Sequence, residues 1–401
     1  MRTRNALAFV LLVTFLGSAG LGHGTGTASD PFDLRAIQRY LTPKQRLGSA
    51  LFFDTDLSQP KGQSCATCHD PRFAFTDPDK RFPTSKGVIP GRFGNRNTPT
   101  AMYMAYSPAF GFNKEEALFV GGQFVDGRAA TLEEQAKQPF LNPLEMHNPN
   151  RERVIQKVRQ AEYAPLFKEV YGKDALWDTD AAYERMVDAI AAFEHTSLFN
   201  PFSSKYDAYL AGRAKLTAQE LRGLFVFENE RKGNCAACHP NRPAKDGTPA
   251  VLTDFTYDNI GVPRNPYSAF YDLPAEFNPD GKRFVDKGLG KIVHRANENG
   301  KFKVTTLRNI ALTSPYMHNG YFKSLRAVVD FYNSRDTKPV CKDRFTSEEQ
   351  AVRTGCWPEP EVAENVNKDE LGNLGLSDRE IDDLVAFLLT LTDGWDKDAR
   401  R

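Results

Sequence analysis

Two copies of one short pattern of cysteines and a histidine constrain this chain more than any other feature. Residues 64–70 read SCATCHD, and residues 234–240 read NCAACHP. In the pattern Cys-x-x-Cys-His, two thiols can form thioether bonds to the vinyl groups of a haem while the adjacent imidazole ligates the iron. One copy arises by chance often enough to mean little, but two copies predict two covalently bound haem c groups. The residues concerned are Cys65, Cys68, His69, Cys235, Cys238 and His239.

Other uses of four cysteines fit this pattern less well. A zinc ribbon places two Cys-x-x-Cys pairs about 15 to 20 residues apart so that four thiolates close one tetrahedron, and here the pairs lie much further apart. A thioredoxin-type redox pair does not need a histidine directly after it. Two disulfides are a further alternative in an exported chain. The histidine after each pair favours haem over all three.

The segments that precede the two patterns also repeat. Residues 41–54 read LTPKQRLGSALFFD, and residues 216–228 read LTAQELRGLFVFE. In each segment a threonine is followed three residues later by Gln or Glu, which is the capping-box signature of a helix start. This duplication predicts two related haem domains dominated by helices, over residues 30–198 and 199–401.

The rest of the chain divides into helices and long loops. Apolar residues at helical spacing predict helices over 179–199 and 377–391, the second opened by a capping box of Ser377 and Glu380. Stretches rich in Gly and Pro over 71–113 and 240–290 predict long loops that pack around the haems. The predicted fold class is therefore mostly α with long loops.

The N-terminal residues predict export. Arg2 and Arg4 precede an apolar run over residues 6–16, and small residues follow, which is the pattern of a cleaved secretory signal peptide, here over residues 1–28. A membrane anchor is the alternative, but the run has about half of the ~20 apolar residues that a bilayer span needs. We expect a periplasmic mature chain without a membrane span. The net charge of +1, with both signs interspersed, gives no basic surface of the kind that binds nucleic acid.

Two further cysteines, Cys341 and Cys356, enclose a short segment. In an exported chain this pair predicts a disulfide worth roughly 3 kcal/mol. The surrounding residues 336–370 look like an insertion before the last helix. The isolated histidines are expected to be surface or satisfied core residues: His147, His195 and His294. The tryptophans are expected to be packing groups, with an exposed one able to pass electrons as the alternative: Trp177, Trp357 and Trp395.

The chain resembles the family of bacterial dihaem cytochrome c peroxidases and MauG over nearly its whole mature length. Beyond the haem motifs the resemblance rests on GNRNTPT (94–100), FVDGRAATLEEQAKQPFLNPLEM (124–146), FKVTTLRNIALTSPYMHNG (302–320) and SLRAVVDFYN (324–333). It implies two cytochrome c-like α domains whose haems communicate across the domain interface. It also implies that the N-terminal haem reacts with hydrogen peroxide and that the C-terminal haem transfers electrons.

The resemblance further implies which side chains act on peroxide. Cleavage of the O–O bond needs an open iron position and a group that moves a proton from the inner to the outer oxygen. In the family pattern this group is the glutamate of NPLEM, here Glu145, assisted by the glutamine of LEEQ, here Gln135. Without the resemblance, Glu145 would be interpreted as a solvated carboxylate at a helix end.

Two departures from the family pattern mark this chain. Ordinary members carry a histidine that caps the peroxidatic iron, whereas the corresponding stretch here reads KGVIPGRFG (86–94), and no histidine lies between His69 and His147. This resembles MauG and implies a permanently open N-terminal haem. Val125 also replaces the tryptophan of the family's FWDGR, which leaves the route of electron transfer between the haems undefined.

The sixth ligand of the second haem is a further point of resemblance to MauG. At the position where ordinary members have a methionine, this chain has Tyr332. A phenolate stabilises ferric and higher oxidation states, whereas a thioether favours the ferrous state. Met317, inside PYMHNG, is the alternative ligand. His318 of the same motif is expected to form hydrogen bonds near the haem or the domain interface.

The family pattern also implies a calcium ion between the haems, held by the Asn97 side chain and by backbone carbonyls of Thr313 and Pro315, since calcium prefers oxygen donors. Asn97 could equally be a turn residue. Family members are often dimers, so a homodimer is one expected assembly.

These features together predict an exported, MauG-like dihaem peroxidase that uses hydrogen peroxide at an open N-terminal haem and draws electrons through a Tyr-ligated C-terminal haem. The electron donor is either a small cytochrome c or cupredoxin, or residues of a protein substrate. The alternatives are an ordinary cytochrome c peroxidase that detoxifies hydrogen peroxide and a non-catalytic dihaem electron-transfer cytochrome. The missing cap argues against the second alternative, because an electron carrier gains from two closed irons.

Overall fold

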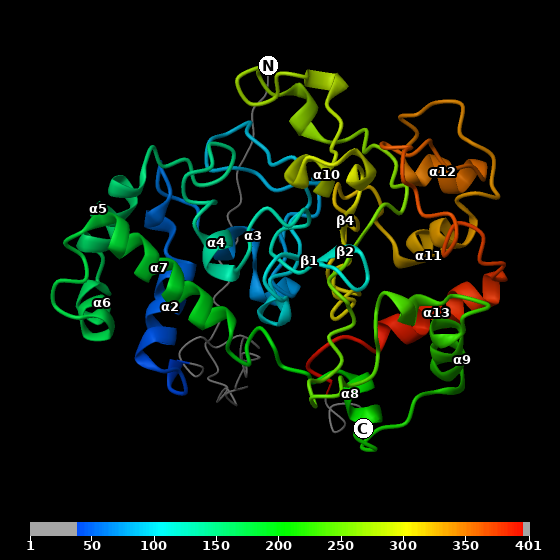
Figure 1. Ribbon diagram of the computed structural model, residues 1–401, viewed down its shortest axis with the longest axis horizontal. Helices are drawn as coiled ribbons and strands as arrows, with labels where there is room; N and C mark the ends of the chain where they lie inside the picture. The colour runs from blue at the N-terminus through cyan, green and yellow to red at the C-terminus, as the bar shows by residue number, and fades with distance from the viewer. Residues whose placement is uncertain (1–37, 396–401) are drawn as a thin grey trace, which may run out of the picture.

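The computed structural model describes residues 38–395, so the predicted signal peptide over 1–28 lies outside the described residues. Within residues 38–395, no helix is both long and apolar enough to cross a membrane. The structure is mostly helical with little sheet (Figure 1). Its helices are α2 (Pro43–Phe53), α3 (Cys65–Cys68), α4 (Leu132–Ala136), α5 (Arg151–Gln160), α6 (Ala164–Tyr171), α7 (Thr179–Glu194), α8 (Lys205–Leu210), α9 (Ala218–Glu228), α10 (Leu289–Val293), α11 (Leu325–Ser334), α12 (Glu348–Thr354) and α13 (Asp378–Leu389).

Two crossed helix pairs repeat in the two halves of the chain. Helix α2 packs on α7 and α9 packs on α13, at opposite sides of the molecule (Figure 1). A glycine lies at each crossing: a Cβ added to Gly48 would lie 1.9 Å from the Ala189 carbonyl oxygen, and one added to Gly223 would lie 1.9 Å from the Asp383 carbonyl oxygen. Both crossings therefore require a residue without a side chain.

The helix starts follow from local sequence. Thr42 with Gln45, and Thr217 with Glu220, form complete capping boxes at α2 and α9, and Ser377 with Glu380 forms another at α13. These three predicted helix starts are confirmed. Helix α7 ends at Glu194 rather than at residue 199, because the chain turns at the following residues and leaves the helix axis.

The apolar side chains gather in two main clusters. The first runs from Leu41 to Phe199 and includes the buried faces of α2, α5 and α7. The second runs from Tyr206 to Leu391 and includes those of α9, α11 and α13. Each Cys-x-x-Cys-His motif is attached to one cluster, since Cys65 packs against the first and Cys235 against the second.

Short strands join the two halves in the middle of the molecule (Figure 1). Strands β1 (Gly111–Asn113) and β2 (Leu118–Val120) form a hairpin with Phe112 opposite Phe119. Strands β3 (Tyr257–Asp258) and β4 (Phe302–Lys303) pair antiparallel, with Tyr257 opposite Lys303. A bridge between Val120 and Thr256 links the two pairs. The predicted long loops thus contain short ladders that connect the halves.

The segment 336–370 packs against α11. Cys341 and Cys356 form the predicted disulfide, and the neighbouring Trp357 is buried against Phe331 and Phe322. Trp177, in contrast, is 77% exposed, so it is the exposed alternative and not a packing group. It lies in the loop between α6 and α7, where nothing covers its ring.

Candidate haem sites

A cavity in the N-terminal half contains the first Cys-x-x-Cys-His motif on its wall. Helix α3 carries Cys65 and Cys68, and His69 follows as its C-terminal cap. The apolar part of the wall includes Phe52 on α2 and Ile190 on α7. The helix crossing described above therefore forms one side of the cavity.

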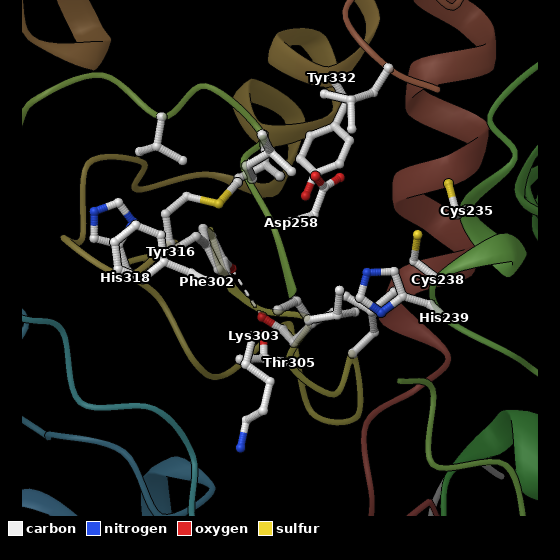
Figure 2. Close-up of a pocket in the computed structure, with 18 of the residues that line it drawn as sticks. Cys235, Cys238, His239, Asp258, Phe302, Lys303, Thr305, Tyr316, His318 and Tyr332 are labelled. Atoms are coloured by element: carbon white, nitrogen blue, oxygen red, sulfur yellow. Dashed lines mark hydrogen bonds between the residues drawn. The ribbon is translucent and has the colours of Figure 1, made fainter. Parts of the chain in front are cut away.

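A second cavity in the C-terminal half contains the other motif. Cys235, Cys238 and His239 lie on one side, and Tyr332 of α11 extends its hydroxyl into the cavity from another (Figure 2). The carboxylate of Asp258 lies beside that hydroxyl (Figure 2). The two motifs thus occupy related positions, each at the end of a crossed helix pair.

The two histidines are held in the same way. The Nδ1 atom of His69 lies 2.9 Å from the Phe75 carbonyl oxygen, and that of His239 lies 2.8 Å from the Leu252 carbonyl oxygen. A carbonyl can only accept, so Nδ1 carries the proton and Nε2 is left as a free ligand atom. Burial lowers the pKa of both imidazoles, that of His239 to about 4. Both are thus neutral and suited to bind a metal.

The four thiols of the motifs are free of disulfides. Burial raises the pKa of each thiol, to about 12 for Cys68, Cys235 and Cys238. These are inert thiols and not redox-active thiolates, because reactive cysteines have lowered pKa values. Two thiols beside one neutral imidazole, on the wall of an apolar cavity, are a donor set that fits covalently attached haem.

Glu145 and Gln135 both lie on the wall of the N-terminal cavity. The Asn142 side-chain amide donates a hydrogen bond of 2.9 Å to Glu145 Oε1. Burial raises the pKa of Glu145, and the positive charge of Arg128 partly opposes this effect. Glu145 is therefore a half-buried carboxyl group on the cavity wall and not the solvated helix-end carboxylate that residue type alone suggests.

The stretch 86–94 packs directly on the segment that carries Glu145. The Val88 N–H donates to the Glu145 carbonyl at 2.9 Å, and a Cβ on Gly87 would lie 2.4 Å from the Leu144 carbonyl oxygen. Among the described residues that line this cavity, His69 is the only histidine. The stretch therefore brings backbone and no imidazole to this wall.

Both candidate sixth ligands lie on the wall of the C-terminal cavity. Tyr332 and Met317 line the same space, and burial, followed by the charge of Asp258, raises the pKa of the Tyr332 hydroxyl. The Tyr332 carbonyl accepts a hydrogen bond of 2.7 Å from the Gly372 N–H, just past the segment 336–370. His318 stacks on Phe302 with ring centres 3.6 Å apart.

The predicted calcium ligands Asn97, Thr313 and Pro315 also line this cavity. The Asn97 side-chain amide donates to the Pro315 carbonyl at 2.5 Å and to the Met317 carbonyl at 3.3 Å. Among the described residues no group of three or more His, Cys, Asp or Glu side chains could hold a metal ion. A cation here would be bound by neutral amide and carbonyl oxygens, which suits calcium, and would need the Asn97 amide turned over.

Sequence reasoning missed a buried ion-pair cluster between the cavities. Arg96 bonds Asp286 through Nε at 2.7 Å and Nη2 at 2.8 Å, and its Nη1 lies 2.6 Å from Asp126. Arg96 belongs to GNRNTPT and Asp126 to FVDGR, so the resemblance contained both residues. Nothing in the sequence marks Asp286 as their partner.

The sequence of this chain is similar to proteins of one known class. Residues 42–215 match the family model described as di-haem cytochrome c peroxidase. MauG of Paracoccus denitrificans is 41% identical over 86% of this chain and 88% of its own length. Cytochrome c551 peroxidase of Nitrosomonas europaea is 33% identical over 82% of this chain and 84% of its own length. The fold and sites define a dihaem c-type oxidoreductase.

Solved structures that resemble this chain belong to the same class. The dihaem peroxidase BthA of Burkholderia thailandensis is 34% identical, with a TM-score of 0.71 over 88% of this chain and 86% of its own. A MauG-like protein associated with microbial copper homeostasis is 28% identical, with a TM-score of 0.65 over 88% of this chain and 90% of its own. The chain belongs to the di-haem cytochrome c peroxidase and MauG family.

Proposed function

We propose that this chain is a periplasmic peroxidase of the MauG-like branch, with an N-terminal peroxidatic domain over 30–198 and a C-terminal electron-transfer domain over 199–401. The observation that carries the proposal is the stretch 86–94, whose ends Lys86 and Gly94 line the N-terminal cavity and which brings no histidine to it. An ordinary capped enzyme needs an imidazole at this wall.

Glu145 would carry the acid–base chemistry. When bound, the N-terminal haem supplies the iron at which peroxide is cleaved. The carboxylate of Glu145 takes the proton from the inner peroxide oxygen and returns it to the outer oxygen, which leaves as water. The raised pKa of Glu145 supports this role, because a carboxyl group with a pKa nearer neutrality both accepts and returns a proton readily. Gln135, on the same wall, orients peroxide through its side-chain amide.

Tyr332 would complete the C-terminal site. Its hydroxyl extends into the cavity that His239 lines (Figure 2). As a phenolate it is a hard, anionic donor that stabilises oxidised iron. This ligand suits a haem that holds oxidising equivalents until an outside donor removes them. The donor is a small cytochrome c, a cupredoxin or a protein substrate, and Asn97, Thr313 and Pro315 hold a calcium ion between the haems.

The test is the reaction of the as-isolated diferric protein with hydrogen peroxide, followed by stopped-flow spectroscopy without any reductant. An open N-terminal haem reacts at once, and prior addition of one electron brings no acceleration. Spectra that stay unchanged until one electron is supplied would contradict the proposal and identify a capped enzyme.

An ordinary cytochrome c peroxidase is the second candidate, because Met317 lines the same cavity as Tyr332. Thioether ligation would favour the ferrous state and a function in peroxide removal. The likeness to cytochrome c551 peroxidase of Nitrosomonas europaea supports this candidate. The identity of the ligand separates the two functions.

A further inference from the structure

A buried lysine lies between the two haem cavities. Lys303, on β4, is 6% exposed and lines both the N-terminal and the C-terminal cavity. Its side chain points away from Tyr332 and from the His239 motif (Figure 2). One charged group of the C-terminal half therefore adjoins both sites.

Two hydrogen bonds hold Lys303 against the N-terminal half. Its Nζ donates to the Gly122 carbonyl at 2.6 Å, and its backbone N–H donates to the Val125 carbonyl at 2.7 Å. The residue opposite it on β3, Tyr257, donates its hydroxyl to the Gly121 carbonyl at 2.6 Å. The ammonium group is thus buried and hydrogen-bonded to the N-terminal half.

The surrounding charges leave the ammonium without a direct counter-ion. Within residues 38–395, no carboxylate lies within ion-pair distance of Lys303 Nζ. Asp126 is the charge that acts most directly on it, and this carboxylate already pairs with Arg96 at 2.6 Å and Arg128 at 2.9 Å. Asp286, the remaining acid of the cluster, pairs with Arg96.

We propose that Lys303 sets the reduction potentials of both haems electrostatically. The positive charge of Lys303 raises both potentials together, and loss of its proton lowers both. A positive charge in a medium of low dielectric constant stabilises the ferrous over the ferric state of a nearby iron. Because Lys303 lines both cavities, a single proton acts on two centres. An enzyme that must hold two oxidising equivalents gains from such a common control.

The protonation state of Lys303 can change under ordinary conditions. Burial lowers its pKa to about 7, and Asp126 opposes this shift only in part. Below that pH the residue is charged and the potentials are high, and above it the residue is neutral and they are low. The position of Lys303 on the walls of both cavities makes this titration relevant to both haems.

The experiment is a spectroelectrochemical titration of the holoenzyme between pH 6 and pH 8. The variant Lys303→Met should shift both midpoint potentials to lower values at pH 6 and should reduce their dependence on pH. Lys303→Arg, which keeps the charge at every pH, should retain the wild-type potentials at pH 6 and lose the fall toward pH 8.

The matched control is Lys157→Met. Lys157 is a half-buried lysine that donates to the Ser58 carbonyl and to Asn148 Oδ1 and lines neither cavity. Its replacement should leave both potentials unchanged. Potentials of Lys303→Met equal to those of the wild type, or a shift at one haem only, would overturn the proposal.

A second measurement keeps the test decisive if Lys303→Met does not attach both haems. In that case the wild type and Lys303→Arg are compared, and equal pH slopes of their potentials would overturn the proposal. Neither measurement uses peroxide. A diferric protein that fails to react with peroxide would contradict the proposed function and leave this result standing.

Discussion

Arg96 and Asp286 form a two-pronged ion pair, with hydrogen bonds of 2.7 Å and 2.8 Å, between segments from the two halves of the chain. Both side chains are largely buried, at 12% and 6% exposure. The pair, together with Asp126, fixes the segment 94–100 against the loop that precedes α10.

Asp286→Asn is expected to destabilise the protein strongly, because it leaves the Arg96 charge buried with one acidic partner fewer. Removal of one partner from a buried ion pair costs about 3–5 kcal/mol. Denaturant unfolding followed by circular dichroism measures the loss. The control is Asp56→Asn, which breaks an exposed pair with Lys61 and should leave the unfolding midpoint unchanged. Equal midpoints for the two variants would show that the Arg96 cluster contributes little.

Glu145→Gln is expected to keep both haems attached and to slow peroxide cleavage by about 10²- to 10⁴-fold, the usual loss for an acid–base group. The wild-type rate should rise with pH through a value above the ordinary pKa of a glutamate, since burial raises the pKa of Glu145 and only the ionised form accepts a proton. This acid limb should vanish in the variant. Glu134→Gln, on the exposed side of α4, is the control, and an unchanged rate in Glu145→Gln would return Glu145 to a structural role.

Tyr332→Phe is expected to change the spectrum of the C-terminal haem, because it removes the oxygen that extends into the cavity. Low-temperature electron paramagnetic resonance of the wild type should show one high-spin and one low-spin ferric haem, without the near-infrared band of a thioether ligand. Tyr332→Met should raise the reduction potential of that haem, since thioether favours the ferrous state. The result that would contradict this assignment is a thioether band that survives in Tyr332→Phe and disappears in Met317→Ala.

The double variant Cys341→Ala, Cys356→Ala is expected to lose roughly 3 kcal/mol of stability, because the disulfide closes a loop of about 15 residues. The loss should fall on the C-terminal half, where Trp357 joins the segment 336–370 to α11. Thermal unfolding measures it, and the wild type in reducing buffer should match the variant. An unfolding temperature equal to that of the oxidised wild type would mean that buried Trp357 holds the segment alone.

Local features of the fold could be predicted from the sequence. Helix starts depend on a side chain and a backbone group three residues apart, so the boxes at Thr42 and Thr217 are visible in the sequence itself. The haem motifs and the short disulfide loop are local in the same sense. Each of these features could be derived without knowledge of the rest of the chain.

Features that depend on distant segments could not be predicted. Gly48 and Gly223 stand in the repeated segments, but only the crossings with α7 and α13 explain why each must be glycine. The contact of stretch 86–94 with the Glu145 segment, and the position of Lys303 between two cavities, likewise arise from chain segments that meet only in the folded state. The resemblance supplied Glu145, Gln135 and Tyr332, and the structure adds the burial and the contacts of each.

The hydrogen bond between the Lys303 amide and the Val125 carbonyl joins the walls of the two cavities at the position where the family pattern has a tryptophan. An electron that crossed at this point would pass the backbone amides of Val125 and Lys303, without an indole on which a hole could rest. Tunnelling of this kind depends steeply on the gap between the two macrocycles, so small changes in the packing of the two halves would govern the exchange rate. Without an indole at this position, the oxidising equivalents have one fewer place on the polypeptide where they could cause damage.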